Sequence, residues 1–304
     1  MGPFADLADI VSRDEPMARH TSFGVGGPVS YFVEPRHWRE LQVVYRRSWG
    51  EGLPVRVLGR GCNTLVSDGP HRWVVIATRR LRWFRRRGRR IDAGAGVDLP
   101  RLVASAEAWG MGGFESFAGI PGTVGGAVAM NAGGRHGSIA DRLVGAVVAF
   151  PGEAPRWMDA GELGLGYRVS RVVGGRPFLF SASFELDRAS PRRIGQRRRS
   201  IVAQKRATQP VGARSAGCVF KNPPGDSAGR LIDKAGLKGA RVGDAVVSHK
   251  HANFIVNRGE ATAADILALI ELIEERVRET FGVRLELEIE VWTDDEERRR
   301  YGRA

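Results

Sequence analysis

The chain has 304 residues, 42% of them hydrophobic and 27% charged, with a formal net charge of +13. The length predicts two or three domains, and the composition is typical of a soluble globular protein. No apolar run could cross a bilayer, and the first residues carry no secretion or lipidation signal, so we expect a cytoplasmic protein that does not enter a membrane. Two cysteines make no disulfide framework, and the six histidines show no metal-ligand spacing, so no metal site is expected.

Arginine supplies most of the positive charge, in runs at 85–87, 89–90 and 197–199. Such runs can be a nucleic-acid footprint. They lack aromatic residues interleaved at a regular spacing, which favours a solvated, arginine-rich surface. A third interpretation is attraction of polyanionic small molecules such as nucleotides.

The first elements predict a small domain over residues 1–80. Hydrophobic spacing predicts a helix over 37–49, and strands are expected over 55–58 and 73–77. A second domain is expected over 81–188. It begins with a strand over 91–93 and a helix that Asp98 would cap, and strands over 144–150 and 178–186 close it.

The remaining residues, 189–304, predict a third domain. Helices are expected over 190–206 and 226–234, with strand-like pieces within 246–256. A longer helix begins at Thr262, where Thr262-x-x-Asp265 resembles a capping box, and ends at Gly282. The alternation of apolar and acidic residues over 285–291 predicts a half-exposed strand, and residues 296–304 a frayed tail.

Two glycine-rich segments favour a bound dinucleotide. The first, Gly59-x-Gly61-Cys62-Asn63, follows a predicted strand, and backbone N–H groups in such a turn can hold a pyrophosphate. It lacks the full Gly-x-Gly-x-x-Gly fingerprint and would alone be a tight turn. The second segment, over 119–134, would let the backbone approach a flat ligand closely.

Three kinds of side chain could carry chemistry. Cys218, in the run 215–223, has a reference pKa near 8.5, so it can donate a proton; the alternative is a buried, inert cysteine. Arg168 follows Tyr167 in a loop and is suited to a carboxylate, although a surface arginine is the simpler interpretation. Glu286, Glu288 and Glu290 share one face of the last predicted strand, either exposed or with one turned into a cleft.

Taken together, these segments resemble the UDP-N-acetylenolpyruvoylglucosamine reductase (MurB) family over about residues 20–292. The matching stretches are 20–27, 59–65, 119–127, 166–168, 217–223, 235–239, 251–254 and 285–288. The resemblance implies an α+β protein with a two-subdomain FAD-binding fold of the vanillyl-alcohol-oxidase (PCMH) type and a C-terminal α+β substrate domain. The absence of tyrosine between residues 186 and 205 resembles the shorter second subtype, without a tyrosine loop.

The resemblance also implies a reaction. NADPH reduces non-covalently bound FAD, and flavin N5 passes hydride to C3 of the enolpyruvyl group of a UDP-sugar, giving UDP-N-acetylmuramate for peptidoglycan synthesis. Arg168 then stabilises the substrate carboxylate, Glu288 acts beside it, and Cys218 donates the proton to C2. We expect a monomer, with the UDP-sugar and NADPH as partners and no nucleic acid or membrane.

The implied binding residues follow from the matched motifs. Substrate contacts are expected from Tyr167, Lys221 and Asn222. Flavin contacts are expected from the two glycine-rich segments, at Gly59, Gly61, Cys62, Asn63, Thr64, Leu65, Gly119, Ile120, Pro121, Gly122, Thr123, Gly125, Gly126 and Ala127.

The sequence departs from the family at Arg135-His136, near the expected flavin edge, and at 205–210, which leaves open the cation that meets the diphosphate. Two rival functions remain at this point: another flavin enzyme of the same fold with a different substrate, and a basic nucleic-acid-binding protein.

Overall fold

The structure, a computed structural model, describes residues 2–172 and 177–294. The chain forms two compact units, each built from three segments of the sequence. Unit 1 comprises residues 1–15, 29–60 and 72–204, and unit 2 comprises 16–28, 61–71 and 205–304. The expected division into three domains at residues 80 and 188 stays a prediction, and the expected tail at 296–304 lies outside the described residues.

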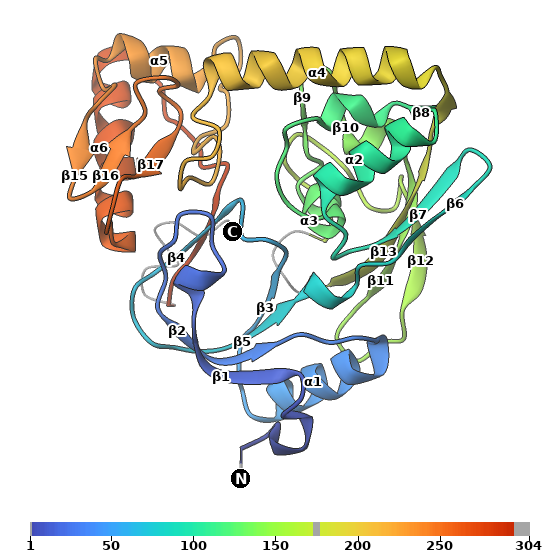
Figure 1. Cartoon of the computed structure of the whole chain (residues 1–304). Helices are drawn as coiled ribbons and strands as arrows, with labels where there is room; N and C mark the ends of the chain where they lie inside the picture. The colour runs from blue at the N-terminus through green and yellow to red at the C-terminus, as the bar shows by residue number, and fades with distance from the viewer. Residues whose placement is uncertain (1, 173–176, 295–304) are drawn as a thin grey trace. The chain divides into compact units, whose positions relative to one another are not determined.

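A four-stranded sheet begins the fold, in the order β1-β2-β5-β3. Its strands β3 and β5 are parallel, and helix α1 precedes β3 and buries Leu41, Val44 and Tyr45 (Figure 1). The helix and both strands expected here are confirmed. The elements of this part are η1 (Ala5–Leu7), β1 (Val11–Pro16), η2 (Met17–Arg19), β2 (Pro28–Val33), α1 (Trp38–Gly50), β3 (Val55–Leu58), β4 (Thr64–Val66), β5 (His71–Ala77) and η3 (Thr78–Arg80).

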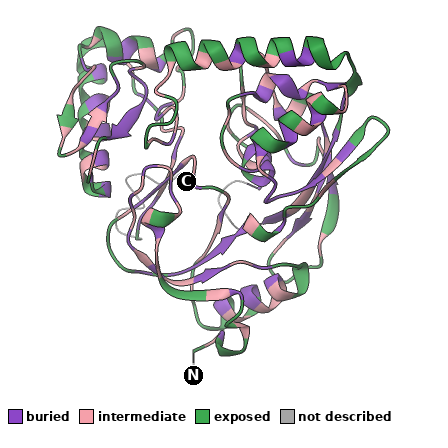
Figure 2. Ribbon diagram, viewed as in Figure 1, coloured by how far each residue is buried: buried purple, intermediate pink, exposed green. Residues whose placement is uncertain are grey.

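A five-stranded antiparallel sheet, β12-β11-β13-β7-β6, makes up the rest of unit 1. Its buried face carries aliphatic and phenylalanine side chains that continue the core of unit 1 (Figure 2). Its elements are β6 (Phe84–Arg87), β7 (Arg90–Gly94), α2 (Leu99–Ala108), β8 (Met111–Gly112), η4 (Phe114–Phe117), α3 (Val124–Ala129), β9 (Gly133–Gly134), β10 (Gly137–Ser138), η5 (Ile139–Asp141), β11 (Leu143–Ala149), β12 (Arg156–Asp159), β13 (Phe178–Glu185) and β14 (Asp187–Arg188).

Helix α4 (Pro191–Thr208) leads into the last segment of unit 2. There the hairpins β15-β16-β17 pack against α6, whose apolar stripe Ile266, Leu269, Ile270, Ile273 and Val277 is buried as predicted. Strand β18 pairs in parallel with β4, which the chain formed much earlier. The elements are α5 (Ala228–Lys234), β15 (Arg241–Val242), β16 (Ala245–Val247), β17 (Ile255–Asn257), α6 (Ala263–Phe281) and β18 (Glu290–Trp292).

Two sequence expectations need correction. Asp98 occupies the N-cap position of α2 but makes no capping hydrogen bond; its carboxylate pairs with Arg60 instead. The strand expected over 285–291 is wrong over most of its length, since only Glu290–Trp292 forms β18 and Leu287 makes one isolated bridge with Phe220. The alternation was real, but the segment changes pairing partner between residues 287 and 290, which interrupts the ladder.

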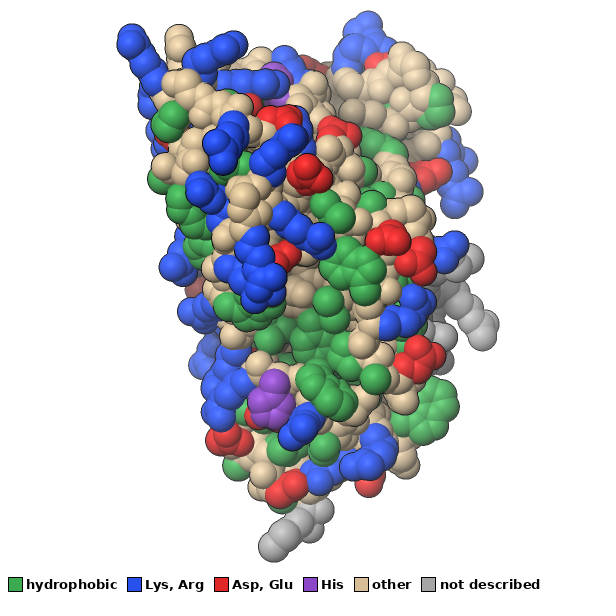
Figure 3. Space-filling model, turned by 90° about the vertical axis from the view of Figure 1, so that its right-hand side faces the viewer, with side chains coloured by type: hydrophobic (Ala, Val, Ile, Leu, Met, Phe, Trp, Pro, Cys, Tyr) green, Lys and Arg blue, Asp and Glu red, His purple; other side chains and the backbone are tan. Residues whose placement is uncertain are grey.

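The arginine runs are on the surface, where some of the guanidinium groups pair with carboxylates and others lie over tryptophan rings. In α4, Arg197 pairs with Glu115 and Arg198 with Glu107. Figure 3 shows cationic and hydrophobic side chains intermixed on one face of the molecule. Near the β6–β7 hairpin the guanidinium groups lie over tryptophan rings, in the pairs Arg85–Trp83, Arg86–Trp109 and Arg90–Trp157. Trp83 is a near neighbour of Arg85 in the sequence, but spacing along the sequence could not reveal the contacts with Trp109 and Trp157.

The start of α6 allows a test of the fold. Thr262 accepts the Asp265 N–H at 3.0 Å and Asp265 accepts the Thr262 N–H at 2.9 Å, which completes the predicted capping box. Thr262→Ala should lower the free energy of unfolding by about 1 kcal/mol. The matched control is Thr280→Ala, an exposed position in the last turn of the same helix. Urea midpoints measure both, and an equal effect of the two substitutions would contradict the capping role.

Among the described residues, every helix is too short or too polar to span a bilayer.

Candidate active site

The turn after β3 approaches the second glycine-rich segment. A Cβ on Gly59 would lie 2.6 Å from Oγ1 of Thr123, so glycine is what permits this approach. Arg60 in the same turn pairs with Asp98, and Asp98 forms an isolated β-bridge with Thr123. Two segments far apart in the sequence therefore meet in unit 1, as the interpretation of a shared dinucleotide site requires.

The second segment lies against the end of β7. The Val124 and Gly125 N–H groups donate to the carbonyls of Val97 and Ala95, both at 2.9 Å. A Cβ on Gly125 would lie 2.9 Å from Cβ of Ala95. By contrast, Gly122, with φ of +119°, faces open space. The segment is thus fixed on one side and accessible along its backbone on the other. The expected flavin contacts of Gly119, Ile120, Pro121, Gly126 and Ala127 stay predictions.

The other half of the first turn belongs to unit 2. Gly61 has a φ of +62°, and a Cβ there would lie 2.1 Å from the His20 carbonyl oxygen. Cys62 and Asn63 are half-buried, whereas Thr64 and Leu65 are buried in β4. The Leu65 side chain is part of the core of unit 2. The expected flavin contacts from this half of the turn also stay predictions.

Gly59 gives a direct test of the cradle. Gly59→Ala places a methyl group against the Thr123 hydroxyl, so the Thr123 side chain or the segment that carries it must shift, and we expect the dissociation constant of FAD to rise at least about tenfold. Gly50→Ala is the matched control, because a Cβ at Gly50 meets nothing within 4 Å. Titration of the apoprotein with FAD, followed by flavin fluorescence, measures both constants. Equal affinities would contradict the role of this contact.

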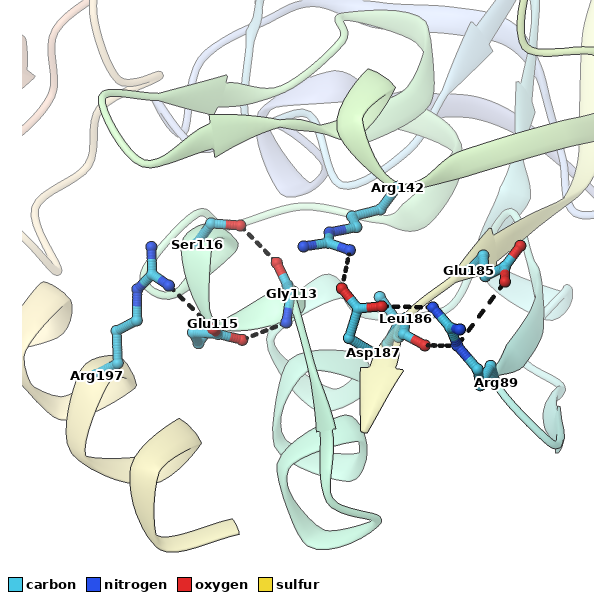
Figure 4. Close-up of polar contacts among 9 residues, drawn as sticks. All are labelled: Arg89, Gly113, Glu115, Ser116, Arg142, Glu185, Leu186, Asp187 and Arg197. Carbon is cyan, nitrogen blue, oxygen red and sulfur yellow. Dashed lines mark hydrogen bonds and ion pairs between the residues drawn. The ribbon is translucent and has the colours of Figure 1, made fainter. Parts of the chain in front are cut away.

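A buried carboxylate anchors the chain just before the second segment. Glu115 accepts the Gly113 N–H at 2.6 Å and pairs with Arg197 of α4 at 3.5 Å (Figure 4). In the same view Asp187 joins Arg142 to Arg89. Pairing of this kind is what makes a buried carboxylate tolerable. No local sequence pattern indicates this ion pair, because Glu115 and Arg197 are 82 positions apart.

Arg168 is held by the second glycine-rich segment. Its guanidinium donates to the carbonyls of Gly133 at 2.9 Å and Asn131 at 3.5 Å, and lies over the Tyr167 ring. The backbone of Arg168 has a φ of +58°, a left-handed conformation that is costly for a long side chain. Strain of this kind persists where the surroundings impose it, often at functional sites. Tyr167 itself is exposed.

Asn131 is a site residue that the sequence reasoning missed. It is buried, also has a positive φ, of +40°, and donates from Nδ2 to the Gly166 carbonyl at 2.9 Å. Its Oδ1 accepts the Ala140 N–H at 2.9 Å. Asn131 thus ties the arginine loop to the glycine-rich segment. An asparagine among glycines is a usable signal, since asparagine tolerates the left-handed region better than most residues.

The segment that carries Cys218 is held from two sides within unit 2. Asn253, buried and also missed as a site residue, accepts the Phe220 N–H and donates to the Phe220 carbonyl, at 2.9 and 2.8 Å. On the other side, Phe220 bridges to Leu287. Cys218 is half-buried and not in a disulfide. A thiol on a backbone fixed in this way is suited to deliver a proton at a defined point.

Lys221 and Asn222 make structural contacts. The Lys221 ammonium group pairs with the exposed Glu286 carboxylate at 3.0 Å. Asn222 accepts the Ala228 N–H at 3.1 Å, at the start of α5. The three glutamates therefore differ: Glu286 is exposed and paired with a lysine, while Glu288 and Glu290 are half-buried. The substrate roles of Lys221 and Asn222 stay predictions.

Glu288 connects this segment to the first turn. Its N–H donates to the Val219 carbonyl at 2.8 Å, one residue beyond Cys218. Its own carbonyl accepts from Nδ2 of Asn63 at 3.1 Å. The segment of the predicted proton donor and the predicted flavin turn are thus both hydrogen-bonded to the backbone of the predicted glutamate.

Comparison with known proteins decides the family. Residues 29–153 match the model of an FAD binding domain, and residues 209–292 match the model of the UDP-N-acetylenolpyruvoylglucosamine reductase C-terminal domain. A reductase of this name from Geobacter metallireducens is 45% identical over 290 residues, covering 94% of this chain and 95% of the relative. Another, from Symbiobacterium thermophilum, is 42% identical over 300 residues, covering 96% of this chain and 97% of the relative. The chain belongs to the UDP-N-acetylenolpyruvoylglucosamine reductase (MurB) family.

Solved structures agree with this assignment. MurB from Thermus caldophilus superimposes with a TM-score of 0.81 at 42% identity, covering 93% of this chain and 99% of that one. A solvent-stable cholesterol oxidase shares the fold alone, with a TM-score of 0.50 at 18% identity, covering 62% of this chain and 40% of that one. The expected fold class is confirmed, as is the expectation of a flavin-dependent oxidoreductase.

The residues present fit FAD. The close approach of Gly59 to Thr123 and the open backbone at Gly122 form a cradle that side chains would otherwise fill. The flavin contacts expected from Gly59, Gly122, Thr123 and Gly125 belong to this cradle and stay predictions. Within residues 2–172 and 177–294, the structure shows no group of three or more metal-ligating side chains.

Two basic residues of unit 2 have shifted acid–base behaviour. Burial lowers the pKa of Lys205 to about 8. Burial and, second, the charge of Lys238 lower the pKa of His251. Lys205 begins the segment 205–210, where the sequence departs from the family. An anion bound beside it would favour its charged form.

Lys205 predicts a pH dependence of stability. Its folded pKa lies below its ordinary value of 10.5, so the unfolded chain binds more protons between about pH 8 and 10.5. The loss of folding stability caused by burying the charged Lys205 ammonium group is therefore largest below pH 8, and it declines as the pH rises through this window. Lys205→Met should raise the unfolding midpoint more at pH 7 than at pH 10. The exposed Lys234→Met is the control, and an unchanged difference between the two pH values would contradict the burial effect.

Proposed function

We propose that this chain catalyses the NADPH-dependent, FAD-mediated reduction of UDP-N-acetylglucosamine enolpyruvate to UDP-N-acetylmuramate in peptidoglycan precursor synthesis. When bound, FAD accepts hydride from NADPH and supplies it to C3 of the enolpyruvyl group. The observation that carries the proposal is the Glu288 backbone, whose N–H and C=O join the Cys218 segment to the Asn63 turn in a chain of this family. We further propose that the protein acts in the cytoplasm as a monomer.

The residues have separate roles in this reaction. Hydride addition to C3 leaves negative charge on C2 and on the adjoining carboxylate. Arg168 meets that carboxylate, where a fixed cation stabilises the transition state more than the substrate. The carbonyls of Asn131 and Gly133 orient its guanidinium. The Glu288 carboxyl group acts beside Arg168 at the developing enolate.

Cys218 completes the reaction by giving its proton to C2. A thiol is a stronger acid than a serine hydroxyl, so this step needs no further acid. One hydride and one proton are added to the carbon–carbon double bond, and NADPH leaves as NADP⁺. The thiolate is then reprotonated from solvent. Tyr167, Lys221, Asn222 and the basic segment at Lys205 are proposed to contact the UDP-sugar.

The deciding experiment is the visible absorption spectrum of the purified protein under anaerobic conditions. Flavin absorption should bleach on addition of NADPH and recover on addition of the enolpyruvyl UDP-sugar. Bleaching without recovery would indicate a flavin enzyme of the same fold with another substrate. A protein that cannot take up FAD would exclude the oxidoreductase function and bring nucleic-acid binding by the basic surface forward.

A further inference from the structure

The backbone N–H and C=O of Glu288 are both held, by groups from different parts of unit 2. Its N–H donates to the Val219 carbonyl at 2.8 Å, and its C=O accepts from Asn63 Nδ2 at 3.1 Å. Asn63 also accepts, through its backbone carbonyl, the Glu290 N–H at 2.8 Å. One asparagine therefore contacts the residues on both sides of Ile289, with its side chain on one side and its backbone on the other.

Glu288 also sits at an irregularity in the pairing. The N–H groups of Glu288 and Ile289 both point to the Val219 carbonyl, at 2.8 and 3.4 Å. Two consecutive residues thus donate to a single carbonyl beside the isolated Phe220–Leu287 bridge, the hydrogen-bond pattern of a β-bulge, although none of the three residues belongs to a regular strand. Bulges redirect side chains and occur next to active sites. They also interrupt the ladder that normally fixes register, so a further contact is needed to hold Glu288 in place.

We propose that the Asn63 side chain is a positioning residue, which fixes Glu288 at this bulge beside the segment that carries Cys218. The inference rests on the proposed function of Glu288. The Asn63 amide suits this role because its Nδ2–H group donates to a carbonyl that the bulge excludes from a regular ladder. Ser67 secures the other end of β18, since its N–H donates to the Trp292 carbonyl at 3.0 Å. The side-chain bond of Asn63 reaches the Glu288 carbonyl.

Amide hydrogen exchange of the FAD-bound protein tests whether the contact holds the segment. Asn63→Ala should speed exchange in a peptide spanning 285–292 at least about tenfold relative to peptides of α6. The control is Asn257→Ala, which removes the bond from Nδ2 to the Phe23 carbonyl at 2.9 Å, and two bonds accepted by Oδ1 from Gly259 and Ala261, elsewhere in the same unit. Equal exchange at 285–292 in Asn63→Ala and wild type would overturn the proposal.

A double-mutant cycle then tests whether Asn63 acts through Glu288. The measured rate is reoxidation of the reduced flavin by the enolpyruvyl UDP-sugar. Asn63→Ala should slow it by about 10- to 100-fold, as expected for a misplaced catalytic group. In the Glu288→Gln background the same change should have an effect of less than about threefold, because the group it positions is already disabled. If the double variant were slowed by the product of the two single-variant factors, Asn63 would act independently of Glu288. That result would overturn the inference while leaving the proposed function intact.

The cycle separates the inference from the function on which it rests. If Glu288→Gln alone reoxidised at the wild-type rate, the proposed role of Glu288 would fail, and the inference with it. Should Asn63→Ala not retain FAD, Asn63→Asp keeps the size of the side chain but presents an acceptor to the Glu288 carbonyl. The same rates and the same exchange measurement apply to that variant, with the same outcomes deciding.

Discussion

Replacing Cys218 with alanine should slow reoxidation of the reduced flavin by the enolpyruvyl UDP-sugar by about 10²- to 10⁴-fold, the contribution typical of a positioned general acid. Reduction of the flavin by NADPH should continue at nearly the wild-type rate, because that step needs no proton at C2. Anaerobic stopped-flow absorbance measures both steps in one preparation. The two rates together distinguish loss of a proton donor from general damage to the site.

Cys218→Ser provides the graded comparison. A hydroxyl has the right reach but is a weaker acid than a thiol, so its reoxidation rate should lie between those of wild type and Cys218→Ala. The backbone on either side is held by Asn253 and Leu287, so neither substitution should displace the segment. Wild-type reoxidation in the alanine variant would show that the proton comes from elsewhere.

The second large effect is expected at Arg168. Arg168→Lys keeps the charge but loses the planar fork that can grip a carboxylate and reach the Asn131 and Gly133 carbonyls together. We expect kcat/KM for the UDP-sugar to fall by about 10²- to 10³-fold, the range found when a preorganised oxyanion contact is removed. Flavin reduction by NADPH should again be nearly unchanged.

Arg171→Lys is the matched control for this substitution. Arg171 is exposed in the same loop, and its backbone N–H donates to the Leu163 carbonyl at 2.9 Å, which the substitution leaves in place. Its kcat/KM should stay within about twofold of wild type. Equal losses in the two variants would indicate that the loop tolerates no lysine, rather than that Arg168 meets the substrate.

Local sequence patterns predicted those elements whose bounds depend on residues close together in the sequence. The stripe and capping box of α6 and the glycine that ends it are features of adjacent residues, so the helix was predicted almost to its bounds. The 285–291 segment failed because alternation shows that a stretch is half-buried but not which strands it joins. The first part of this segment bonds to residues 219–221 and its last part pairs with β4. Neither partner is near the segment in the sequence.

The site was predicted unevenly for the same reason. Glycine content indicated that the backbone at 59 and at 122–125 approaches a ligand or another segment closely. The structure shows that Gly59 lies close to Thr123. Cys218, Arg168 and Glu288 gained their interpretation only from the family resemblance. The polar residues that hold them in place, Asn131 and Asn253, act through backbone carbonyls and N–H groups. Such contacts leave little trace in the pattern of side-chain types.

The parallel pairing of β4 with β18 has a consequence for how the protein is made. Ser67 bonds to the carbonyl of Trp292, which is 225 positions later, so β4 has no β18 to pair with during most of synthesis. Domains generally fold from the N-terminus as the chain emerges, and contacts this distant form slowly. Unit 2 therefore cannot close around the first glycine turn until residues 290–292 have left the ribosome. A nascent chain can bring Gly59 and Thr123 together within unit 1 early, but it acquires Glu288, for which we propose a catalytic role, only at the last stage of translation.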